Sequence, residues 1–485
     1  MLYLDMKMKK TIAFFLLSVF LSVSVSAQNK QTVAILSVND MHATIEYFPQ
    51  LAAIADSLRA VYPQLLVFSA GDNRTGNPIN DLYPEPCYPM TALMNAVGFN
   101  ASTLGNHELD GGAATLAKVI DRSHFHYLCC NVLPPEEMGV HLRPYEIFDV
   151  NGIRVGVLGL LQVNERGIPD CHVDRARGIT FVNPEDAVRQ YLPEVREKSD
   201  VCLLLSHIGY EDDLRMADAF PQFDGIIGGH SHTKVPCTME NGVMITQTQN
   251  KLRYASLTRY YLEDGKVVGK EATLIDVRAW PAKDGFVQNI VNYFSDNPEF
   301  KVALTELEEP ITTVVEMGNL VTDAWRTETG ADFAISNMGG IRTDEHAAGA
   351  FTLADVLRTD PFGNESVVIE VTAKELAQMV IDVNAGDPKY GLPVISGFRA
   401  DVYLNKDDYL DVHRVDVFDS DGKKLCKSKK YKIATNSYVT SILASPRHDE
   451  GTLLGCTSSD LLKGYLQKQQ SIRPDGDRRL RIIEE

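Results

Sequence analysis

Five short polar stretches of the 485-residue sequence contain the residue types that bind divalent cations. Together they hold five of the twelve histidines, along with aspartate and asparagine side chains. Imidazoles mixed with carboxylate and amide oxygens form a donor set suited to a catalytic metal site. The stretches are Asp40-Met41-His42, Gly71-Asp72-Asn73, Gly105-Asn106-His107-Glu108, Ser206-His207 and Gly229-His230-Ser231-His232.

Two divalent ions about 3.5 to 4 Å apart need one bridging carboxylate, several neutral imidazoles and further oxygen ligands. We predict that Asp72 is the bridging ligand. Because none of the five stretches contains cysteine, the pattern favours an open catalytic centre over a closed thiolate zinc site. Zn, Mn, Fe and Co all accept such ligands, so the sequence leaves the metal open. The remaining predicted ligands are Asp40, His42 and His232 for one ion, and Asn106, His207 and His230 for the other.

The polar stretches follow apolar segments that have the composition of buried strands. Residues 33–38 (VAILSV), 65–69 (LLVFS), 201–205 (VCLLL) and 225–227 each end just before one of them. Between the first two segments, residues 50–61 have the apolar spacing of a helix. This alternation predicts an α/β fold with parallel strands, in which ligands gather beyond the carboxyl ends of the strands.

Each stretch also has a structural explanation of its own. An Asp-x-His pair after a strand is common in turns and helix caps, and Gly-Asp-Asn is a turn signal. The five stretches nevertheless occur together, each at the end of a predicted strand. We therefore interpret them as one metal centre.

The order of these motifs resembles that of the calcineurin-like metallophosphoesterases. Together with the second half of the chain, it is similar to the bacterial and animal 5'-nucleotidase family, which includes periplasmic UDP-sugar hydrolases. The resemblance implies an α/β architecture, with a four-layer β-sandwich flanked by helices and a second, smaller α/β substrate-binding domain. It also implies hydrolysis of a phosphate ester with the help of two divalent ions.

The same resemblance implies catalytic roles next to the metal ligands. His107 is similar to the family histidine that stabilises the transition state and helps to protonate the leaving oxygen. Asp110 would hold the imidazole of His107 in one tautomer. Asp110 also has a structural alternative, because it could cap a helix predicted over residues 112–121. Glu108 is assigned no role beyond a structural one.

The second half of the chain carries motifs for substrate binding. A helix is predicted to open at residues 317–320 and to close at 329–332, ahead of a short strand at 333–335. By the resemblance, Arg342 would contact phosphate or carboxylate oxygens with Asn337 assisting, and Phe362 would stack on a base whose edge Asn364 contacts. Taken alone, Phe362 could be a core aromatic, and the glycine pair before Arg342 a tight turn.

Two departures from the family pattern affect the substrate pocket. Relatives usually carry an additional arginine in the region of residues 302–318, where this chain has no lysine or arginine. One phosphate contact is therefore missing or supplied from elsewhere. Tyr438 takes the place of a second stacking aromatic, but residues 441–451 (SILASPRHDEG) replace the glycine-rich stretch that normally follows. This replacement leaves the shape of the second wall of the base pocket open.

The N-terminus has the pattern of a signal peptide. A basic segment at residues 7–10 precedes an apolar run over 12–25, and small residues lead to predicted cleavage after Ala27. The apolar run is shorter than the roughly 20 residues needed to span a bilayer. We therefore expect an exported protein, periplasmic or secreted, without a stable membrane anchor. The predicted division is 1–27 signal peptide, 28–278 metallophosphoesterase catalytic domain, 279–304 linker helix and 305–485 5'-nucleotidase C-terminal substrate-binding domain.

Composition limits the class of ligand. The formal net charge of −18 becomes about −20 without the first 27 residues, which carry a net charge of +2. Such an acidic protein is a poor binder of nucleic-acid polymers. A small phosphate ester remains suitable, because bound metal ions dominate the local charge of a site.

Three functions are compatible with these motifs. The first is an exported, metal-dependent phosphohydrolase that releases phosphate from nucleoside 5'-monophosphates. The second keeps the chemistry and changes the substrate to 2',3'-cyclic nucleotides, 3'-nucleotides or nucleotide sugars. The third is a non-catalytic nucleotide-binding protein on a degenerate phosphatase fold. The sequence leaves the oligomeric state open.

Overall fold

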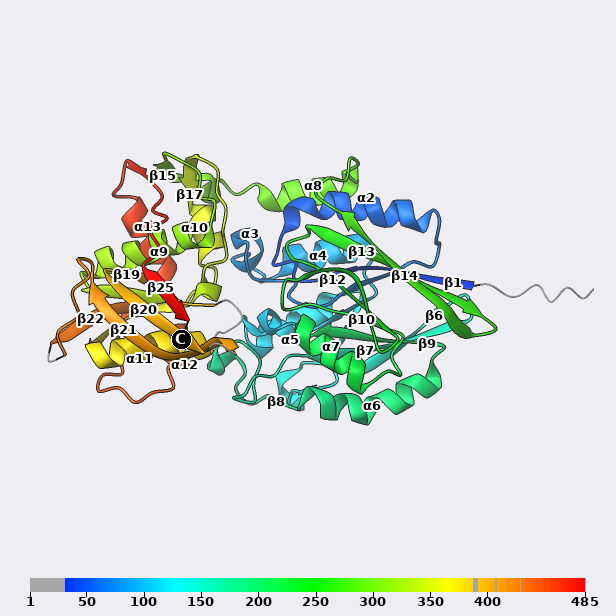
Figure 1. The fold of residues 1–485 in the computed structure, drawn as a ribbon. Helices are drawn as coiled ribbons and strands as arrows, with labels where there is room; N and C mark the ends of the chain where they lie inside the picture. The colour runs from blue at the N-terminus through cyan, green and yellow to red at the C-terminus, as the bar shows by residue number, and fades with distance from the viewer. Residues whose placement is uncertain (1–30, 387–390, 406–407, 428, 485) are drawn as a thin grey trace, which may run out of the picture.

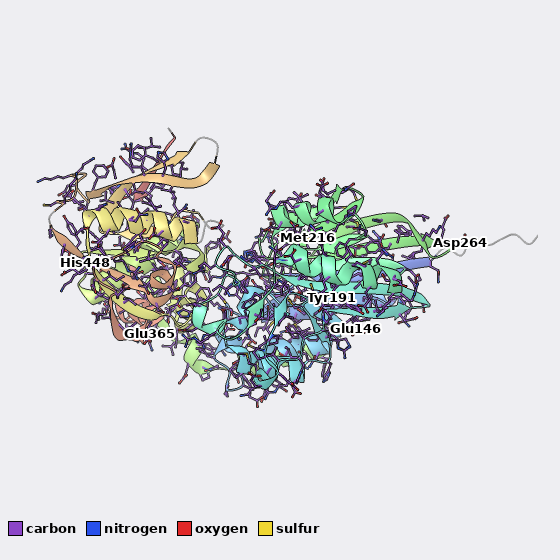
Figure 2. The ribbon with its side chains drawn as sticks, turned by 90° about the horizontal axis from the view of Figure 1, so that it is seen from below. Glu146, Tyr191, Met216, Asp264, Glu365 and His448 are labelled. Atoms are coloured by element: carbon purple, nitrogen blue, oxygen red, sulfur yellow. The ribbon has the colours of Figure 1, made fainter. Side chains whose placement is uncertain are left out.

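The computed structural model describes residues 31–386, 391–405, 408–427 and 429–484, so the predicted signal peptide lies outside the described residues. The chain forms two bodies (Figure 1). The larger body, on the right of the figure, extends from β1 through α8, and the smaller body, on the left, begins at β15. Figure 2 shows the same division from below, with Tyr191 and Met216 in the larger body and Glu365 and His448 in the smaller one.

Two six-stranded sheets form the centre of the larger body. In the first sheet, β1, β2, β3 and β4 are parallel, and β13 pairs antiparallel with β1. In the second sheet, β7, β9, β10 and β12 are parallel. The first sheet has the order β14 (Lys266–Asp276), β13 (Tyr254–Glu263), β1 (Gln31–Val38), β2 (Leu66–Ser69), β3 (Ala101–Thr103) and β4 (His126–Leu128). The second has the order β11 (Lys234–Glu240), β12 (Val243–Thr248), β10 (Gly225–Ile227), β9 (Val201–His207), β7 (Ile153–Leu161) and β6 (Tyr145–Val150).

Side-chain alternation along the strands produces four layers. In β1, Val33 and Ile35 pack against residues of the second sheet, such as Leu203. The intervening Ala34 and Leu36 belong to the core that the first sheet forms with its covering helices. A further core joins the second sheet to α6 and α7. The order helix, sheet, sheet, helix confirms the predicted four-layer architecture.

The helices of the larger body cover the outer faces of the two sheets. The predicted linker helix is α8, which packs against α2 and α4 and contributes Val287, Val291 and Phe294 to their core. By its packing, α8 thus belongs to the larger body. The helices are α2 (Phe48–Arg59), α3 (Pro78–Asp81), α4 (Tyr88–Val97), α5 (Ala113–Arg122), α6 (Pro184–Lys198), α7 (Tyr210–Ala219) and α8 (Gly285–Ser295).

A five-stranded sheet forms the centre of the smaller body, with helices on both faces. One face packs against α11 and the strands β20 and β21, and the other against α9 and α13. The sheet has the order β19 (Val394–Ser396), β16 (Phe333–Ser336), β22 (Lys430–Asn436), β18 (Glu365–Thr372) and β23 (Thr452–Thr457). The helices are α9 (Val314–Thr329), α10 (Leu353–Thr359), α11 (Ala373–Gly386), α12 (Ser437–Ile442) and α13 (Ser458–Leu466).

Two three-stranded sheets complete the smaller body, which matches the predicted second α/β domain. They are β17 (Gly349–Thr352), β15 (Ala303–Leu307) and β24 (Ser471–Ile472), and β21 (Asp408–Asp419), β20 (Phe398–Asn405) and β25 (Leu480–Glu484). A two-stranded sheet of β5 (Val132–Leu133) and β8 (Thr180–Phe181) lies in the larger body. Among the described residues, no helix has both the length and the apolar character needed to cross a membrane.

Candidate metal centre and substrate pocket

The predicted metal ligands lie at the carboxyl ends of the parallel strands. Asp40 follows β1, Asp72 follows β2, Asn106 follows β3, His207 is the last residue of β9 and His230 follows β10. Backbone hydrogen bonds join the loops, since Asp40 N–H donates to the Gly71 carbonyl at 3.0 Å. The structure thereby brings together residues up to 190 positions apart in the chain.

Five of the seven predicted ligands have left-handed backbone conformations. Positive φ in a residue other than glycine is unfavourable, and it clusters at functional sites where the surrounding fold enforces it. This backbone conformation lets ligands that are close in sequence direct their side chains toward the same point. These residues are Asp40 (φ 48°), His42 (45°), Asp72 (51°), His230 (76°) and His232 (55°).

The donor atoms form two adjoining clusters, Asp40–His42–His232 and Asp72–His207–His230. In the first, His232 Nε2 lies 3.2 Å from Asp40 Oδ1 and 3.0 Å from His42 Nε2. In the second, His207 Nε2 lies 3.1 Å from Asp72 Oδ2. Asn106 joins the second cluster, with its Oδ1 3.0 Å from His230 Nδ1. All seven predicted ligands therefore converge.

Backbone carbonyls fix the orientation of two of the imidazoles. The Nδ1 of His42 donates to the Thr75 carbonyl at 3.1 Å, and that of His207 donates to the Ala70 carbonyl at 2.6 Å. In each ring the other nitrogen, Nε2, then faces the cluster. This arrangement of a carbonyl behind a histidine is typical of metal-binding imidazoles.

The seven converging side chains have the chemistry needed to bind divalent cations. Asp40 Oδ1 and His207 Nε2 are buried, and each has another ligand side chain within 3.2 Å but no hydrogen bond of normal geometry, although buried polar atoms normally have one. Burial opposes the charged form of Asp40, but His232 and His207 lower its pKa to about 2. Burial also opposes the charged form of His207, but the carboxylates of Asp72 and Asp40 raise its pKa to about 9. The carboxylates thus stabilise positive charge at this point.

His107 and Asp110 form a hydrogen-bonded pair beside the clusters. His107 Nδ1 lies 2.8 Å from Asp110 Oδ2, which also accepts from Thr75 Oγ1 at 2.7 Å. Burial opposes the charged imidazole, but the carboxylates of Asp72 and Asp110 raise the pKa of His107. Helix α5 begins at Ala113 with Gly112 as its cap residue, so Asp110 lies against the histidine and does not cap the helix.

Glu108 joins two of the ligand loops. Its carboxylate accepts hydrogen bonds from the backbone N–H groups of Asp72 (3.0 Å), Asn73 (2.9 Å) and Gly105 (2.6 Å). Glu108 therefore fixes the loop of Asp72 relative to the loop of Asn106. The sequence carries a signal for this role: Glu108 stands three positions after Gly105, the residue before a helical turn, and this is the spacing of a capping box.

Gln247 of β12 holds the loop that carries His230 and His232. Its Oε1 accepts from Ser231 Oγ (2.9 Å) and from the backbone N–H of Thr233 (2.5 Å), and its Nε2 donates to the Gly229 carbonyl (2.9 Å). No sequence motif marked this residue.

We expect Gln247→Ala to weaken metal binding by about 10- to 100-fold, because the loop loses all three hydrogen bonds. Metal titration of the metal-free variant, followed by inductively coupled plasma mass spectrometry, measures this change. The exposed Gln222 of the same body, replaced by alanine, is the control and should bind metal like the parent protein. Equal affinity for the Gln247 and Gln222 variants would contradict a positioning role.

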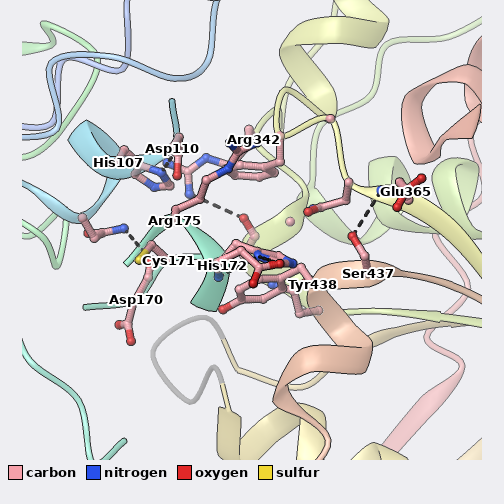
Figure 3. Close-up of a pocket in the computed structure, with 18 of the residues that line it drawn as sticks. His107, Asp110, Asp170, Cys171, His172, Arg175, Arg342, Glu365, Ser437 and Tyr438 are labelled. Atoms are coloured by element: carbon pink, nitrogen blue, oxygen red, sulfur yellow. Dashed lines mark hydrogen bonds and ion pairs between the residues drawn. The ribbon is translucent and has the colours of Figure 1, made fainter. Parts of the chain in front are cut away.

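A cavity of about 390 Å³ lies between the two bodies and opens beside the clusters (Figure 3). From the larger body it is lined by Asn106, His107, Asp110 and His230. From the smaller body it is lined by all five predicted substrate residues, Asn337, Arg342, Phe362, Asn364 and Tyr438.

Phe362 is only partly buried and faces His107 in the pocket. Its ring is stacked on the imidazole, with centroids 5.7 Å apart and an interplanar angle of 25°. Arg342 lies next to Phe362 and to the first cluster: its guanidinium carbon is 5.8 Å from the Phe362 ring centre, and its Nη2 is 2.9 Å from His42 Nε2. A core role for Phe362 is therefore excluded.

The second wall of the pocket consists of Ser437 and Tyr438 at the start of α12. Residues 441–451, which replace the family's glycine-rich stretch, make contacts with α11: Ser445 N–H and Oγ donate to Asp382, and His448 lies against Glu375. The larger body adds a wall that the sequence did not indicate, formed by Asp170, Cys171, His172, Asp174 and Arg175.

Comparison with known proteins relates each half of the chain to a known family of domains. The model of the calcineurin-like phosphoesterase family matches residues 33–234, and that of the 5'-nucleotidase C-terminal domain matches residues 298–442. Protein UshA of Escherichia coli is 26% identical over 548 aligned positions, covering 96% of this chain and 97% of that protein. The chain joins a calcineurin-like phosphoesterase to a 5'-nucleotidase C-terminal domain. It is therefore a hydrolase of the metallophosphoesterase type, and the family implies divalent metal ions.

Further relatives and solved structures agree with this two-part assignment. The 5'-nucleotidase of Vibrio cholerae is 25% identical over 420 positions, covering 72% of this chain and 75% of that protein. The solved 5'-nucleotidase precursor of Thermus thermophilus superposes with a TM-score of 0.80 at 22% identity, covering 94% of this chain and 100% of that one. The sulfate thiohydrolase SoxB superposes with a TM-score of 0.78 at 16% identity, covering 93% and 96%. Since SoxB carries a different activity in its name, this fold alone does not define the substrate.

Proposed function

We propose that the protein releases inorganic phosphate from nucleoside 5'-monophosphates at a centre of two divalent ions. The observation that carries this proposal is the cavity, which joins the metal-binding cluster to Phe362 and Tyr438. A phosphate group and a purine or pyrimidine base attached to one ribose need these two environments within one pocket.

The proposed ligands are Asp72 as the bridge, Asp40, His42 and His232 for one ion, and Asn106, His207 and His230 for the other. When bound, such ions neutralise phosphoryl oxygens and make water nucleophilic at neutral pH. The chain's own residues orient the substrate. Arg342 offers its guanidinium to phosphoryl oxygens, and Asn337 lies beside it in the pocket wall.

His107 is proposed to donate a proton to the ribose oxygen that leaves. The neighbouring carboxylate of Asp110 receives its Nδ1–H, which directs Nε2 into the site. The raised pKa of His107 favours the protonated form that a general acid needs.

Phe362→Ala is expected to raise the KM for 5'-AMP by about 10-fold, because base stacking is lost. The kcat/KM for a base-free phosphate ester should change far less. The paired control is Phe286→Ala, which removes an exposed ring on α8 outside the pocket and should leave both values unchanged. If kcat/KM falls equally for both substrates in Phe362→Ala, Phe362 does not bind the base.

The experiment that tests the function is a substrate panel with the protein beginning at Gln28. Phosphate release is measured with Mn²⁺ or Zn²⁺ on 5'-AMP, 3'-AMP, 2',3'-cyclic AMP, UDP-glucose and a base-free ester. Preference for 5'-AMP supports the proposal. Preference for a cyclic, 3' or sugar-linked nucleotide keeps the metal centre and rejects the 5'-monophosphate as substrate.

Export and the domain division are part of the same proposal. The N-terminal pattern supports removal of residues 1–27, and Edman sequencing of the protein from culture supernatant and periplasm would test it. The catalytic domain is proposed over residues 28–278 and the substrate-binding domain over 305–485, with 279–304 between them. The separate hydrophobic cores of the two bodies support this division.

A further inference from the structure

Helix α8 is apolar on two sides. Its sequence, GFVQNIVNYFS, contains no charged residue, although 23% of the chain is charged. The inner side contributes Val287, Val291 and Phe294 to the core that α8 shares with α2 and α4. The outer side exposes 68% of Phe286 and 74% of Tyr293 to solvent. Because a helix that is apolar all round is normally buried, the outer side of α8 has the composition of a covered surface.

Phe286 and Tyr293 lie on the same side of α8. They are seven residues, or two helical turns, apart, which separates them by about 10.5 Å along the helix axis. Asn289 lies between them and is also exposed. Figure 1 shows α8 along the upper edge of the larger body, beside α2. These three residues are called the α8 stripe below.

A groove of about 690 Å³ adjoins the α8 stripe. Tyr293 forms one of its walls, and the others include Leu82 and Tyr83, which follow α3, and Phe300 of the helical turn η5 (Pro298–Lys301). A hydrogen bond between the side chains of Tyr293 and Tyr83 fixes the exposed ring in place. Of the described residues that line the groove, Asp296 alone carries a charge. Such a groove beside a fixed aromatic ring is suited to an aromatic side chain of a partner.

The two ends of α8 carry opposite charges. Lys283 precedes the helix and is exposed, and Asp296 follows it with 86% of its side chain exposed. Asp296 also lies 3.5 Å from Lys301, but this exposed pair is weak and leaves the carboxylate accessible to a second cation. Lys283 is three positions before Phe286, and Asp296 is three positions after Tyr293. A two-fold rotation that exchanges the ends of α8 therefore places unlike charges, and the two aromatic residues, opposite each other.

We infer that the protein forms a homodimer in which the α8 stripes of two copies pack antiparallel about a two-fold axis. Phe286 of each copy enters the groove beside Tyr293 of the other, and Lys283 pairs with Asp296 across the contact. Uncharged aromatic residues at the centre and charges at the rim are the usual anatomy of a protein interface. The net charge of about −20 without the first 27 residues opposes contact through other surfaces. The inference is independent of the proposed function, because the α8 stripe does not line the catalytic pocket.

The first test is sedimentation velocity of the protein from Gln28 at about 1 to 100 µM, a range that covers dimers of moderate affinity. The parent protein should sediment as a dimer at the upper end. Tyr293→Asp should raise the Kd of the dimer by at least about 100-fold, because the two-fold axis places the lost aromatic anchor in the interface twice. Val268→Asp is the matched control, since it changes an apolar residue of β14 that is 59% exposed, and it should dimerise like the parent.

The second test exchanges the two charges. Lys283→Asp and Asp296→Lys should each raise the Kd by about 10-fold, since each places like charges opposite each other at the rim. The double variant restores an unlike pair with the signs reversed, and its Kd should return close to that of the parent. Within one copy the two residues lie at opposite ends of α8, about 17 Å apart. Recovery in the double variant therefore reports a contact between copies.

A parent protein that is monomeric throughout this range would overturn the inference. A monomeric parent that floats with phosphatidylcholine vesicles would overturn it in favour of a membrane surface. A dimer that Tyr293→Asp leaves intact would show that the interface lies elsewhere, and a double variant as weak as the single ones would reject the antiparallel arrangement. Circular dichroism identifies folded variants. Because the charge exchange alters only exposed side chains, it decides the question even if Tyr293→Asp does not fold.

Discussion

Replacing His107 with alanine is expected to lower kcat for 5'-AMP by about 10²- to 10⁴-fold, the range of a lost general acid. Its Nδ1 is held by Asp110, and its Nε2 lies 4.0 Å from Asp72 Oδ2, at the edge of the clusters. The ribose oxygen that leaves is strongly basic, so the reaction slows without a proton donor. The rate of phosphate release at saturating 5'-AMP gives kcat, and inductively coupled plasma mass spectrometry gives the number of metal ions bound per chain.

Metal content decides between two roles for His107. Its ring atoms also come within 4.8 Å of donor atoms of His42 and Asp72, an arrangement that a metal ligand would have. A general acid can be removed without loss of metal, whereas a ligand cannot. Loss of an ion from His107→Ala would therefore contradict our assignment. The control is the exposed His141, whose replacement by alanine should leave kcat and metal content unchanged.

Asp72→Asn is expected to give the second large effect, with loss of both ions and a fall in activity of at least about 10³-fold. Asp72 lies between His42 and His107 on one side and His207 and His230 on the other. Asparagine keeps the shape and removes the charge that a bridging ligand supplies. Metal content and phosphate release are measured on the same preparation.

Asp213→Asn is the matched control for this change. Asp213 is also a buried aspartate, on α7, and it accepts from Ser206 Oγ at 2.6 Å, next to His207. Burial raises its pKa to about 7, so an uncharged amide is a close substitute. We expect this variant to keep both ions and its activity. If Asp72→Asn binds two ions and remains active, Asp72 is not the bridge.

The sequence predicted the elements that position the site because their signals are local. Residues 33–38 and 65–69 are short apolar runs that end at polar motifs, and both became parallel strands with those motifs at their carboxyl ends. The family resemblance then supplied the order of the motifs and the pocket residues of the second half. Phe362 is an example: taken alone, its position favours a core aromatic, and only the motifs around it favoured the pocket.

The supporting contacts could not be predicted, because they depend on long-range packing. Gln247 is an ordinary strand residue in the sequence, yet it holds the loop of His230 and His232 through hydrogen bonds across 14 to 18 positions. The wall formed by residues 170–175 has no motif and is placed by contacts such as that of Asn106 with the Asp170 carbonyl at 2.9 Å. The left-handed conformations at Asp40 and Asp72 are likewise enforced by the loops that surround them.

The most direct test of the central proposal is the metal titration of phosphate release. The protein from Gln28 is stripped with a chelator, and Mn²⁺ is added back in steps while phosphate release from 5'-AMP is measured. We predict no activity without metal and a rate that rises until two equivalents are bound per chain. Activity that survives removal of the metal, or no phosphate release from 5'-AMP at any metal concentration, would contradict a two-metal 5'-nucleotidase.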